Sequence, residues 1–407
     1  MSGPRLQCAL MRGIREAGIG VYDIGAVPTP VLYFSTVYLK TGSGVAVTGS
    51  HNPPDYNGLK MMLAGETLYG ETIQDLYKAI VADILYTAEE KGSYEKVDVL
   101  PAYMKSITDD VKFSRPIKIV IDAGNGIAGP TAAALFKTLG AEVEELYTNV
   151  DGNFPNHHPD PSKPANLQDL IKALKEGDSE VGLAFDGDGD RLGVVTKDGE
   201  IIYPDRQAML FAGDILSKRP GATIVYDVKC TRNIKPFVES RGGKAVMSRT
   251  GHSLIKAKMK EVNADFAGEM SGHIFFHDRW PGFDDGVYAG TRMIEILTRF
   301  ADANEPLKNL PNAVSTPELQ IPTAEGENFE LVEKIKQNAK FEDAKDIITI
   351  DGIRVEWDDG FALARPSNTT PVVVLRFEAD SEDALKRIQQ RFKDEILRVE
   401  PNARIPF

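Results

Sequence analysis

The chain has 407 residues, of which 26% are charged and 42% hydrophobic, with a formal net charge of −13 at pH 7. This length exceeds a single hydrophobic core, so we expect a globular protein of two to four domains. The acidic balance excludes a broad surface for nucleic acid or anionic membrane, and any phosphate must be bound by a local cluster of Lys and Arg.

Cys8 and Cys230 are the only cysteines and lie far apart in the sequence, which is typical of a reducing compartment without a disulfide framework. No stretch reaches the ~18 continuous apolar residues of a membrane span, and residues 1–6 lack the apolar core of a signal peptide. We therefore expect a cytoplasmic protein that binds neither nucleic acid nor membrane.

The first unit alternates helices and strands. Its first helix is expected to begin at Ser2, as an N-cap, and residues 91–101 are expected to be a polar linker. The predicted helices and strands cover residues 2–17, 21–24, 30–38, 45–47 and 72–87. Since the first helix has an apolar face but no strand before it, we expect an opening strand ahead of it in the complete protein.

Two further units repeat the pattern of strand, polar or glycine-bearing loop, and helix. The strands predicted for them cover residues 117–121, 143–146, 181–185, 223–227, 244–247 and 264–267. From about Thr316 the pattern changes to short antiparallel strands with Asp359-Gly360 as a hairpin turn, followed by a last helix after Ser381. The sequence thus predicts three α/β units and a smaller C-terminal α+β domain.

A serine stands at the end of the predicted strand over residues 45–47. The strand breaks into Thr48-Gly-Ser-His-Asn52, so the Ser50 hydroxyl lies at a carboxyl end of a strand, where ligands bind in α/β sheets. His51 follows directly, and Lys60 lies further along the loop. Taken alone, the stretch is equally compatible with an ordinary turn.

A second loop, Phe-Asp-Gly-Asp-Gly-Asp-Arg, follows an apolar strand. The carboxylates of Asp186, Asp188 and Asp190 would repel one another without a cation, and a set of oxygen ligands indicates Mg²⁺ or a similar ion. An EF-hand is excluded, because its Gly position is Arg191 and its Glu position is Lys197. Arg191 would present a guanidinium to a phosphate beside the metal.

Two more loops carry groups suited to a sugar phosphate. In Gly268-Glu-Met-Ser-Gly-His273, Glu269 and Ser271 can bind vicinal hydroxyls, while His273 is a ligand, a proton carrier or a structural histidine. Arg365-Pro-Ser-Asn-Thr-Thr370 is a phosphate cradle or a hydrophilic hairpin loop. Further basic side chains at strand ends or loops of the third unit are Lys229, Arg232, Arg249 and His252.

Together these loops resemble, in order and spacing, the four signature loops of the α-D-phosphohexomutases, and the resemblance covers nearly all of the chain. The matching stretches are Thr48-Gly-Ser-His-Asn-Pro53, Asp186-Gly-Asp-Gly-Asp-Arg191, Gly268-Glu-Met-Ser-Gly-His273 and Arg365-Pro-Ser-Asn-Thr369. The family implies three related α/β domains with mixed sheets and a smaller α+β domain around a central cleft. We place these domains at residues 1–96, 97–204, 205–312 and 313–407.

The resemblance also implies the roles of the site residues. Ser50 resembles the family's phosphoserine, and Asp186, Asp188 and Asp190 resemble the set that holds Mg²⁺ with a phosphate oxygen on that serine. The residues expected to bind substrate are Lys229, His252, Glu269, Ser271, His273, Arg365, Ser367, Asn368 and Thr369. Those expected to act in catalysis are Ser50, His51, Lys60, Arg191 and His273, with the proton carrier left open among Lys60, His51 and His273.

The expected activity is that of a mutase interconverting hexose 1-phosphate and 6-phosphate, with mannose or glucose as the sugar and glucose 1,6-bisphosphate as activator and intermediate. Met270 and the residues before Ser50 favour the phosphomannomutase/phosphoglucomutase branch over the phosphoglucosamine branch. The family's opening strand and its arginine loop have no counterpart here, so a non-catalytic sugar-phosphate binder is the alternative from another class. A monomer or weak dimer is expected.

Overall fold

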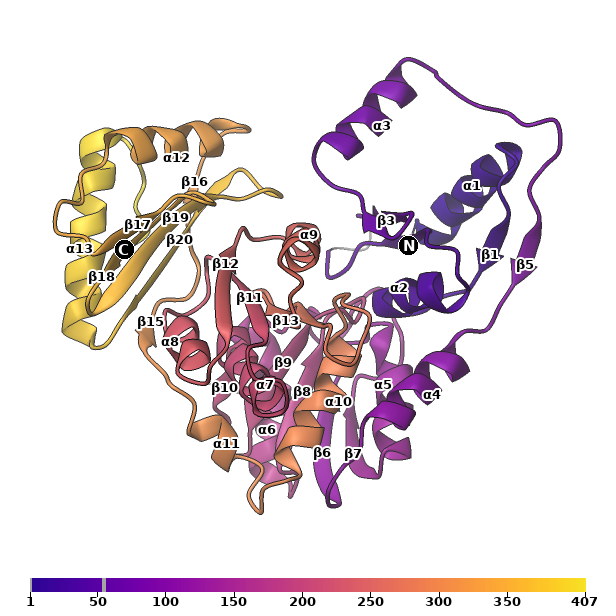
Figure 1. Cartoon of the computed structure of the whole chain (residues 1–407), viewed down its shortest axis with the longest axis horizontal. Coiled ribbons are helices and arrows are strands. Elements are labelled where there is room, and N and C mark those ends of the chain that lie inside the picture. Colours follow the sequence, from indigo (N-terminus) through magenta and orange to yellow (C-terminus); the bar gives the residue numbers. More distant parts are fainter. Residues whose placement is uncertain (1, 53–55) are drawn as a thin grey trace.

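Two mixed sheets form the middle of the molecule, and the first and last units stand on either side of them (Figure 1). The computed structural model describes residues 2–52 and 56–407. Pro53, the last residue of the first signature loop, lies outside the described residues. No helix in the described ranges is long and apolar enough to cross a membrane.

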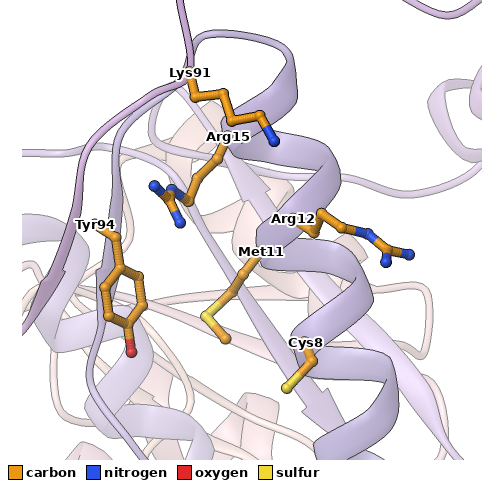
Figure 2. Close-up of a pocket in the computed structure, with 6 residues that line it drawn as sticks. All are labelled: Cys8, Met11, Arg12, Arg15, Lys91 and Tyr94. Atoms are coloured by element: carbon orange, nitrogen blue, oxygen red, sulfur yellow. The ribbon is translucent and has the colours of Figure 1, made fainter.

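The first unit contains two small sheets. β1 and β5 pair in parallel, and β2, β3 and β4 form an antiparallel sheet in that order. Its elements are α1 (Gly3–Glu16), β1 (Val21–Asp23), α2 (Thr29–Tyr38), β2 (Gly44–Thr48), β3 (Gly58–Leu63), β4 (Glu66–Thr67), α3 (Glu71–Val81) and β5 (Tyr94–Lys96). A hollow of about 220 Å³ beside α1 contains none of the predicted site residues; it is lined by Cys8, Met11, Arg12, Arg15, Lys91 and Tyr94 (Figure 2).

The second unit has the strand order β10-β9-β8-β6-β7, in which β8, β6 and β7 are parallel and the other pairs antiparallel. Helix α5 packs against β7, and α6 against β6 and β8. The elements are α4 (Leu100–Asp110), β6 (Ile117–Asp122), α5 (Ala128–Thr138), β7 (Ala141–Leu146), the short 3₁₀ turn Pro164–Leu167, α6 (Gln168–Glu176), β8 (Val181–Phe185), β9 (Leu192–Thr196) and β10 (Ile201–Ile202).

The third unit repeats this plan with the order β12-β11-β13-β14, of which only β14 runs antiparallel to its neighbour. Helix α10 packs against both sheets, contacting β14 on one side and β8 and β9 on the other. The elements are α7 (Pro204–Lys218), β11 (Thr223–Asp227), α8 (Ile234–Glu239), β12 (Lys244–Ser248), α9 (His252–Val262), β13 (Phe266–Gly268), β14 (Ile274–Phe276), α10 (Gly286–Leu297) and α11 (Glu305–Lys308).

The fourth unit is an antiparallel sheet covered by two helices, with a hydrophobic core of its own. A separate core runs continuously through the second and third units and takes in Tyr33 and Phe34 of α2. The elements are β15 (Val314–Ser315), β16 (Leu319–Pro322), α12 (Glu327–Asn338), β17 (Asp346–Ile348), β18 (Ile353–Trp357), β19 (Gly360–Pro366), β20 (Val372–Ala379) and α13 (Glu382–Val399).

This architecture confirms the predicted fold class and corrects three local predictions. Residues 91–101 are not a linker, because they contain β5 and the start of α4. The helix expected over residues 72–87 ends at Val81. Ser2 does not cap α1 with its side chain; its hydroxyl instead accepts a hydrogen bond from Asn57 Nδ2 at 2.7 Å.

Candidate active site

The loop after β2 holds Ser50 in an unusual backbone conformation. Its φ of 50° lies in the left-handed region, which costs a serine free energy and is often found at functional sites. The Ser50 N–H donates to Thr48 Oγ1 at 2.8 Å, which closes the turn. The hydroxyl Oγ then lies 3.2 Å from Asp186 Oδ2 and 3.1 Å from His51 Nδ1. The predicted nucleophile is therefore in contact with the predicted metal loop.

Gly187 allows these two loops to meet. A Cβ at this position would lie only 2.2 Å from the carbonyl oxygen of Ser50, closer than any real side chain approaches a backbone atom. Gly187 therefore allows a close approach between backbones, in addition to spacing the carboxylates.

The metal loop folds around one of its own carboxylates. Asp186 Oδ1 accepts hydrogen bonds from the backbone N–H groups of Gly189, Asp190 and Arg191 at 3.0, 3.0 and 3.1 Å. Burial, and then the charges of Asp190 and Asp188, raise the pKa of Asp186 well above its usual value. One oxygen from each of the three aspartates lies within 4.8 Å of the others, and Asp188 Oδ1 and Asp190 Oδ1 have no hydrogen-bond partner among the described residues. This buried, mutually repelling set of oxygens fits a divalent cation.

Two basic side chains, those of Lys60 and Arg191, neutralise part of the negative charge of the three aspartates. Lys60 on β3 donates to Asp188 Oδ2 at 2.8 Å and to Asp190 Oδ2 at 2.5 Å. Burial alone would lower the pKa of Lys60, but the two aspartates raise it well above its usual value, so Lys60 is an ammonium. Arg191 Nε lies 3.7 Å from Asp186 Oδ2, the same oxygen that the Ser50 hydroxyl contacts.

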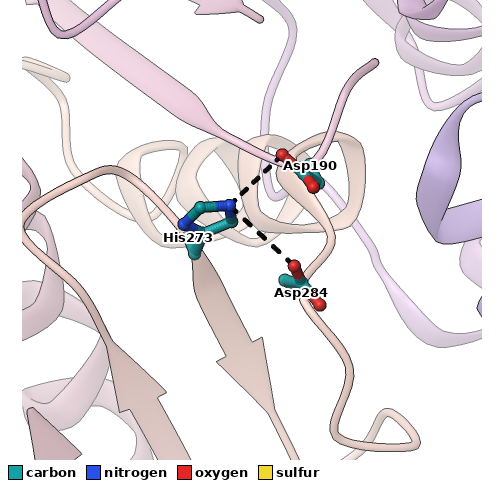
Figure 3. A group of neighbouring side chains, drawn as sticks. All are labelled: Asp190, His273 and Asp284. Atoms are coloured by element: carbon teal, nitrogen blue, oxygen red, sulfur yellow. Dashed lines mark ion pairs between the residues drawn. The ribbon is translucent and has the colours of Figure 1, made fainter. Parts of the chain in front are cut away.

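The loop between β13 and β14 brings the predicted sugar-binding residues beside the metal loop. His273 Nδ1 lies 2.8 Å from Ser271 Oγ and 3.3 Å from Glu269 Oε2. On the other side of the ring, Nε2 faces Asp190 Oδ1 at 3.4 Å and Asp284 Oδ2 at 4.0 Å (Figure 3). Burial would lower the pKa of His273, but Asp190 raises it to about 9.

Two other histidines of the site have the opposite protonation. Burial and the charge of Arg191 lower the pKa of His51 to about 4, so the ring beside Ser50 is neutral at pH 7. Burial likewise lowers the pKa of His252, at the start of α9, to about 4. His252 stacks on His273 with ring centroids 5.6 Å apart. The site thus places a neutral imidazole, His51, beside the hydroxyl of Ser50 and a protonated one, His273, beside Glu269 and Ser271.

The residues predicted to bind a phosphate on the fourth unit form a separate group. Arg365 on β19 is buried and donates from Nε to Asp351 Oδ2 at 2.9 Å, and Thr250 N donates to the same oxygen at 3.0 Å. The Ser367 hydroxyl accepts from the N–H groups of Thr369 and Thr370, while Asn368 is exposed. Lys229 is buried and pairs with Glu318 Oε1 at 2.6 Å. Asp351 therefore links the fourth unit to the loop that leads into α9.

Besides Asp351, three residues of the site were not predicted from the sequence: Thr29, Lys256 and Asp284. Thr29, at the start of α2, donates from Oγ1 to Asp188 Oδ2 at 2.7 Å. Lys256 on α9 donates to Asp284 Oδ1 at 3.0 Å. A signal for Asp284 was present, because Asp284-Asp-Gly follows the apolar Phe283 as the metal loop follows its strand. Thr29 and Lys256 lie within helices, where a single polar residue carries no such signal.

Comparison with known proteins matches all four units to models of one family. Residues 1–86, 101–199 and 203–314 match the phosphoglucomutase/phosphomannomutase alpha/beta/alpha domains I, II and III, and residues 318–395 match the C-terminal domain. The chain belongs to the phosphoglucomutase/phosphomannomutase family. It is therefore an isomerase of the phosphohexomutase class, as predicted.

Individual relatives agree with this assignment. The chain is 58% identical to a phosphoglucomutase of Neisseria gonorrhoeae, over 97% of this chain and 86% of the relative. It is 51% identical to a phosphomannomutase/phosphoglucomutase of Pseudomonas aeruginosa, over 100% of this chain and 88% of the relative. A crystal structure of a family protein from Burkholderia thailandensis superposes with a TM-score of 0.94 at 56% identity, covering 100% of this chain and 89% of that one.

Proposed function

We propose that this mutase interconverts the 1- and 6-phosphates of glucose or mannose through phospho-Ser50. The observation that supports this most strongly is the position of the Ser50 hydroxyl, 3.2 Å from Asp186 Oδ2 in a loop with left-handed backbone. A hydroxyl presented in this way can carry a phosphoryl group whose oxygens reach both the aspartates and Arg191.

The metal site proposed for this enzyme consists of Asp186, Asp188 and Asp190 together with a phosphate oxygen on Ser50, and Mg²⁺ suits its hard oxygen ligands. When bound, the cation would neutralise charge on the phosphoryl group being transferred. Two side chains of the protein contribute to that neutralisation: the Lys60 ammonium pairs with Asp188 and Asp190, and the Arg191 guanidinium lies beside Asp186.

In the proposed first step, the bond between Ser50 Oγ and phosphorus breaks while a bond forms from phosphorus to the free hydroxyl of a hexose 1- or 6-phosphate. This gives a hexose 1,6-bisphosphate, with glucose 1,6-bisphosphate serving as activator for the glucose substrate. After the intermediate turns over, its other phosphate returns to Ser50 Oγ. The serine is phosphorylated again, and the sugar leaves with its phosphate at the other position.

The protonation states suggest how the protons move. His51 is neutral beside Ser50 Oγ, so it can take the serine proton when that oxygen attacks the bisphosphate. Lys60 and His273 both carry protons in the free enzyme, so either can donate to the sugar oxygen that leaves. By microscopic reversibility, the same group accepts the proton of the sugar hydroxyl in the opposite direction.

Substrate recognition is proposed for two groups of residues. Glu269 and Ser271 bind the sugar hydroxyls from the third unit, beside Lys229, His252 and His273. The phosphate that is not reacting is bound by a clamp on the fourth unit, formed by Arg365, Ser367, Asn368 and Thr369. The cytoplasmic location and the monomeric or weakly dimeric state stay predictions.

The direct test is mutase turnover with glucose 1-phosphate, mannose 1-phosphate and glucosamine 1-phosphate. We expect the first two to be converted and Ser50→Ala to lose at least about a thousandfold in kcat. Ser43→Ala, which removes an exposed hydroxyl from the loop before β2, is the matched control and should keep the wild-type rate. Full activity of Ser50→Ala would refute the phosphoserine route, and a preference for glucosamine 1-phosphate would favour the other family branch.

A further inference from the structure

Asp284 lies in the short connection between β14 and α10, where the backbone is firmly held. It forms an isolated β-bridge with Phe275 on β14. The next residue, Asp285, donates from its N–H to the carbonyl of Ile274 at 3.2 Å, and its side chain caps α10 by accepting from Tyr288 N at 2.9 Å. A side chain on this segment is therefore fixed relative to the sugar-binding loop.

The carboxylate of Asp284 is completely buried and faces one ammonium and two imidazoles. Lys256 Nζ lies 3.0 Å from Oδ1, whereas His252 Nδ1 and His273 Nε2 lie 3.5 and 4.0 Å from Oδ2. The Lys256 ammonium offsets the lost hydration of this buried carboxylate, and the two imidazoles lie beside its other oxygen.

One oxygen of the Asp284 carboxylate is buried without a hydrogen bond. Asp284 Oδ2 makes no hydrogen bond among the described residues, and neither does Asp190 Oδ1. These are the two oxygens that His273 Nε2 faces, at 4.0 and 3.4 Å (Figure 3). The imidazole of His273 thus lies between two carboxylates, closer to Asp190 than to Asp284, and its Nε2 also lies 3.4 Å from Arg191 Nε.

We infer that Asp284 is a positioning residue that holds the stacked rings of His252 and His273 against the sugar. When a cation binds to Asp190, Asp284 is the one carboxylate that still holds His273 in place. The inference rests on the proposed function, in which Asp190 is a metal ligand. A cation on Asp190 weakens the attraction between that carboxylate and His273, since the charge of the aspartate is then shared. Asp284 lies outside the proposed ligand set, so it keeps its full charge and its place.

Lys256 contributes to this arrangement from the far side of the carboxylate. Its ammonium lies 4.1 Å from the ring centroid of Tyr33, so the cation is held by an aromatic face as well as by Asp284 Oδ1. This leaves the other oxygen directed at the two imidazoles.

The test compares Asp284→Asn, which removes the charge, and Asp284→Glu, which keeps the charge but displaces it by one methylene group. Asp278→Asn is the matched control, because it removes a similarly buried carboxylate that pairs with Arg292 and takes no part in the cluster. We expect Asp284→Asn to lose 10- to 100-fold in kcat with KM changed less than threefold, Asp284→Glu to lose at least fivefold, and Asp278→Asn to keep wild-type kcat per folded molecule.

A second readout does not depend on turnover. In ¹⁵N spectra of histidine-labelled protein, assigned with His252→Asn and His273→Asn, we expect the ring signal of His273 to stay single in the wild type when Mg²⁺ is added. In Asp284→Asn we expect it to broaden or split on the same addition. The inference is overturned if the His273 signal of Asp284→Asn responds to Mg²⁺ as the wild-type signal does. It is also overturned if Asp284→Asn keeps kcat within twofold of the wild type, or if Asp284→Glu has the full wild-type kcat.

The two proposals fail in different ways. If the wild-type enzyme turns over and Asp284→Asn has the same kcat, the positioning role is overturned and the mutase mechanism stays intact. A wild-type enzyme without turnover contradicts the proposed function, and the histidine spectra then decide the role of Asp284 by themselves. Where Asp284→Asn does not fold, Asp284→Glu supplies both readouts.

Discussion

At the scale of single residues, the site is built from polar atoms that reach across units. Ser50 from the first unit contacts Asp186 from the second, and His273 from the third faces Asp190 from the second. The first contact gives a buried carboxylate a hydroxyl donor from another unit, and the second gives one an imidazolium from another unit. The chemistry of the site therefore exists only when the three units are packed together.

Thr29 is the clearest case of a residue that supports a proposed metal ligand. Its hydroxyl donates to Asp188 Oδ2 at 2.7 Å, and its N–H donates to the Asp188 carbonyl at 2.9 Å. We expect Thr29→Val to weaken Mn²⁺ binding to the protein about tenfold, since partners that orient a ligand typically contribute that much or more. Calorimetric titration with Mn²⁺ measures this, with Thr29→Ser as the control that keeps the hydroxyl. Equal affinities for all three proteins would contradict the assigned role.

The sequence was most informative where one loop carried several functional groups. The three aspartates alternate with glycine directly after an apolar strand, so both their ligand chemistry and their place at a strand end could be predicted. Lys60 was predicted to act in catalysis, but its contact with Asp188 and Asp190 was not predicted, because β3 pairs with β2 in a register that no local pattern records. The role of Thr29 could not be predicted from a local pattern either, since its partner Asp188 lies 159 residues away in the sequence.

At the scale of elements, the local predictions failed where backbone pairing rather than side-chain burial defines the structure. β5 reads Tyr94-Glu-Lys96 and is exposed along its length, so it shows neither an apolar run nor an alternation. It is a strand because it pairs in parallel with β1. Helix α13 is the opposite case: its apolar face is buried against β19 and β20, and its periodicity predicted it correctly.

Helix α13 also carries a test of pH-dependent stability. Burial raises the pKa of Glu395, but hydrogen bonds from Arg398, Lys340 N and Arg391 lower it to about 2. Because the folded-state pKa is depressed, its contribution to stability is present above the unfolded pKa near 4.5 and is lost as pH falls toward 2. We expect Glu395→Gln to lower the free energy of unfolding by about 1–3 kcal/mol at pH 7, with the difference shrinking below pH 4.5.

Urea unfolding followed by the fluorescence of Trp357, the tryptophan of the fourth unit, measures this difference. Glu330→Gln, an exposed acid on α12, is the control and should match the wild type at every pH. A deficit of Glu395→Gln that stayed constant from pH 7 to pH 3 would show that the side chain contributes through packing and not through its charge.

At the scale of the whole molecule, the fourth unit is joined to the rest differently from the other three. The first three units share one continuous core, whereas the fourth has its own core and meets the third through a small apolar contact of Val228 with Phe361 and Leu363. The buried guanidinium of Arg354 strengthens this junction by donating to the carbonyls of Val228 and Cys230, both at 2.7 Å.

Arg354→Met should loosen the fourth unit, because it leaves both carbonyls without their donor at the junction. We expect proteolytic cleavage within residues 309–313, the segment between α11 and β15 that leads into the fourth unit, to become about tenfold faster. A tenfold change corresponds to the loss of about 1.4 kcal/mol. Arg387→Met, which removes an exposed arginine that pairs with Asp359 in the same unit, should cleave at the wild-type rate. Identical cleavage rates for all three proteins would contradict the importance of this junction.

The measurement that tests the central claim most directly is the intact mass of the protein before and after incubation with glucose 1,6-bisphosphate and Mg²⁺, with the modified peptide then mapped. We predict a gain of one phosphoryl group located on Ser50, absent from Ser50→Ala and present in Ser43→Ala. A folded wild-type protein that takes up no phosphoryl group, or takes it up at another residue, would contradict the phosphoserine mechanism and would favour a protein that binds hexose phosphates without converting them.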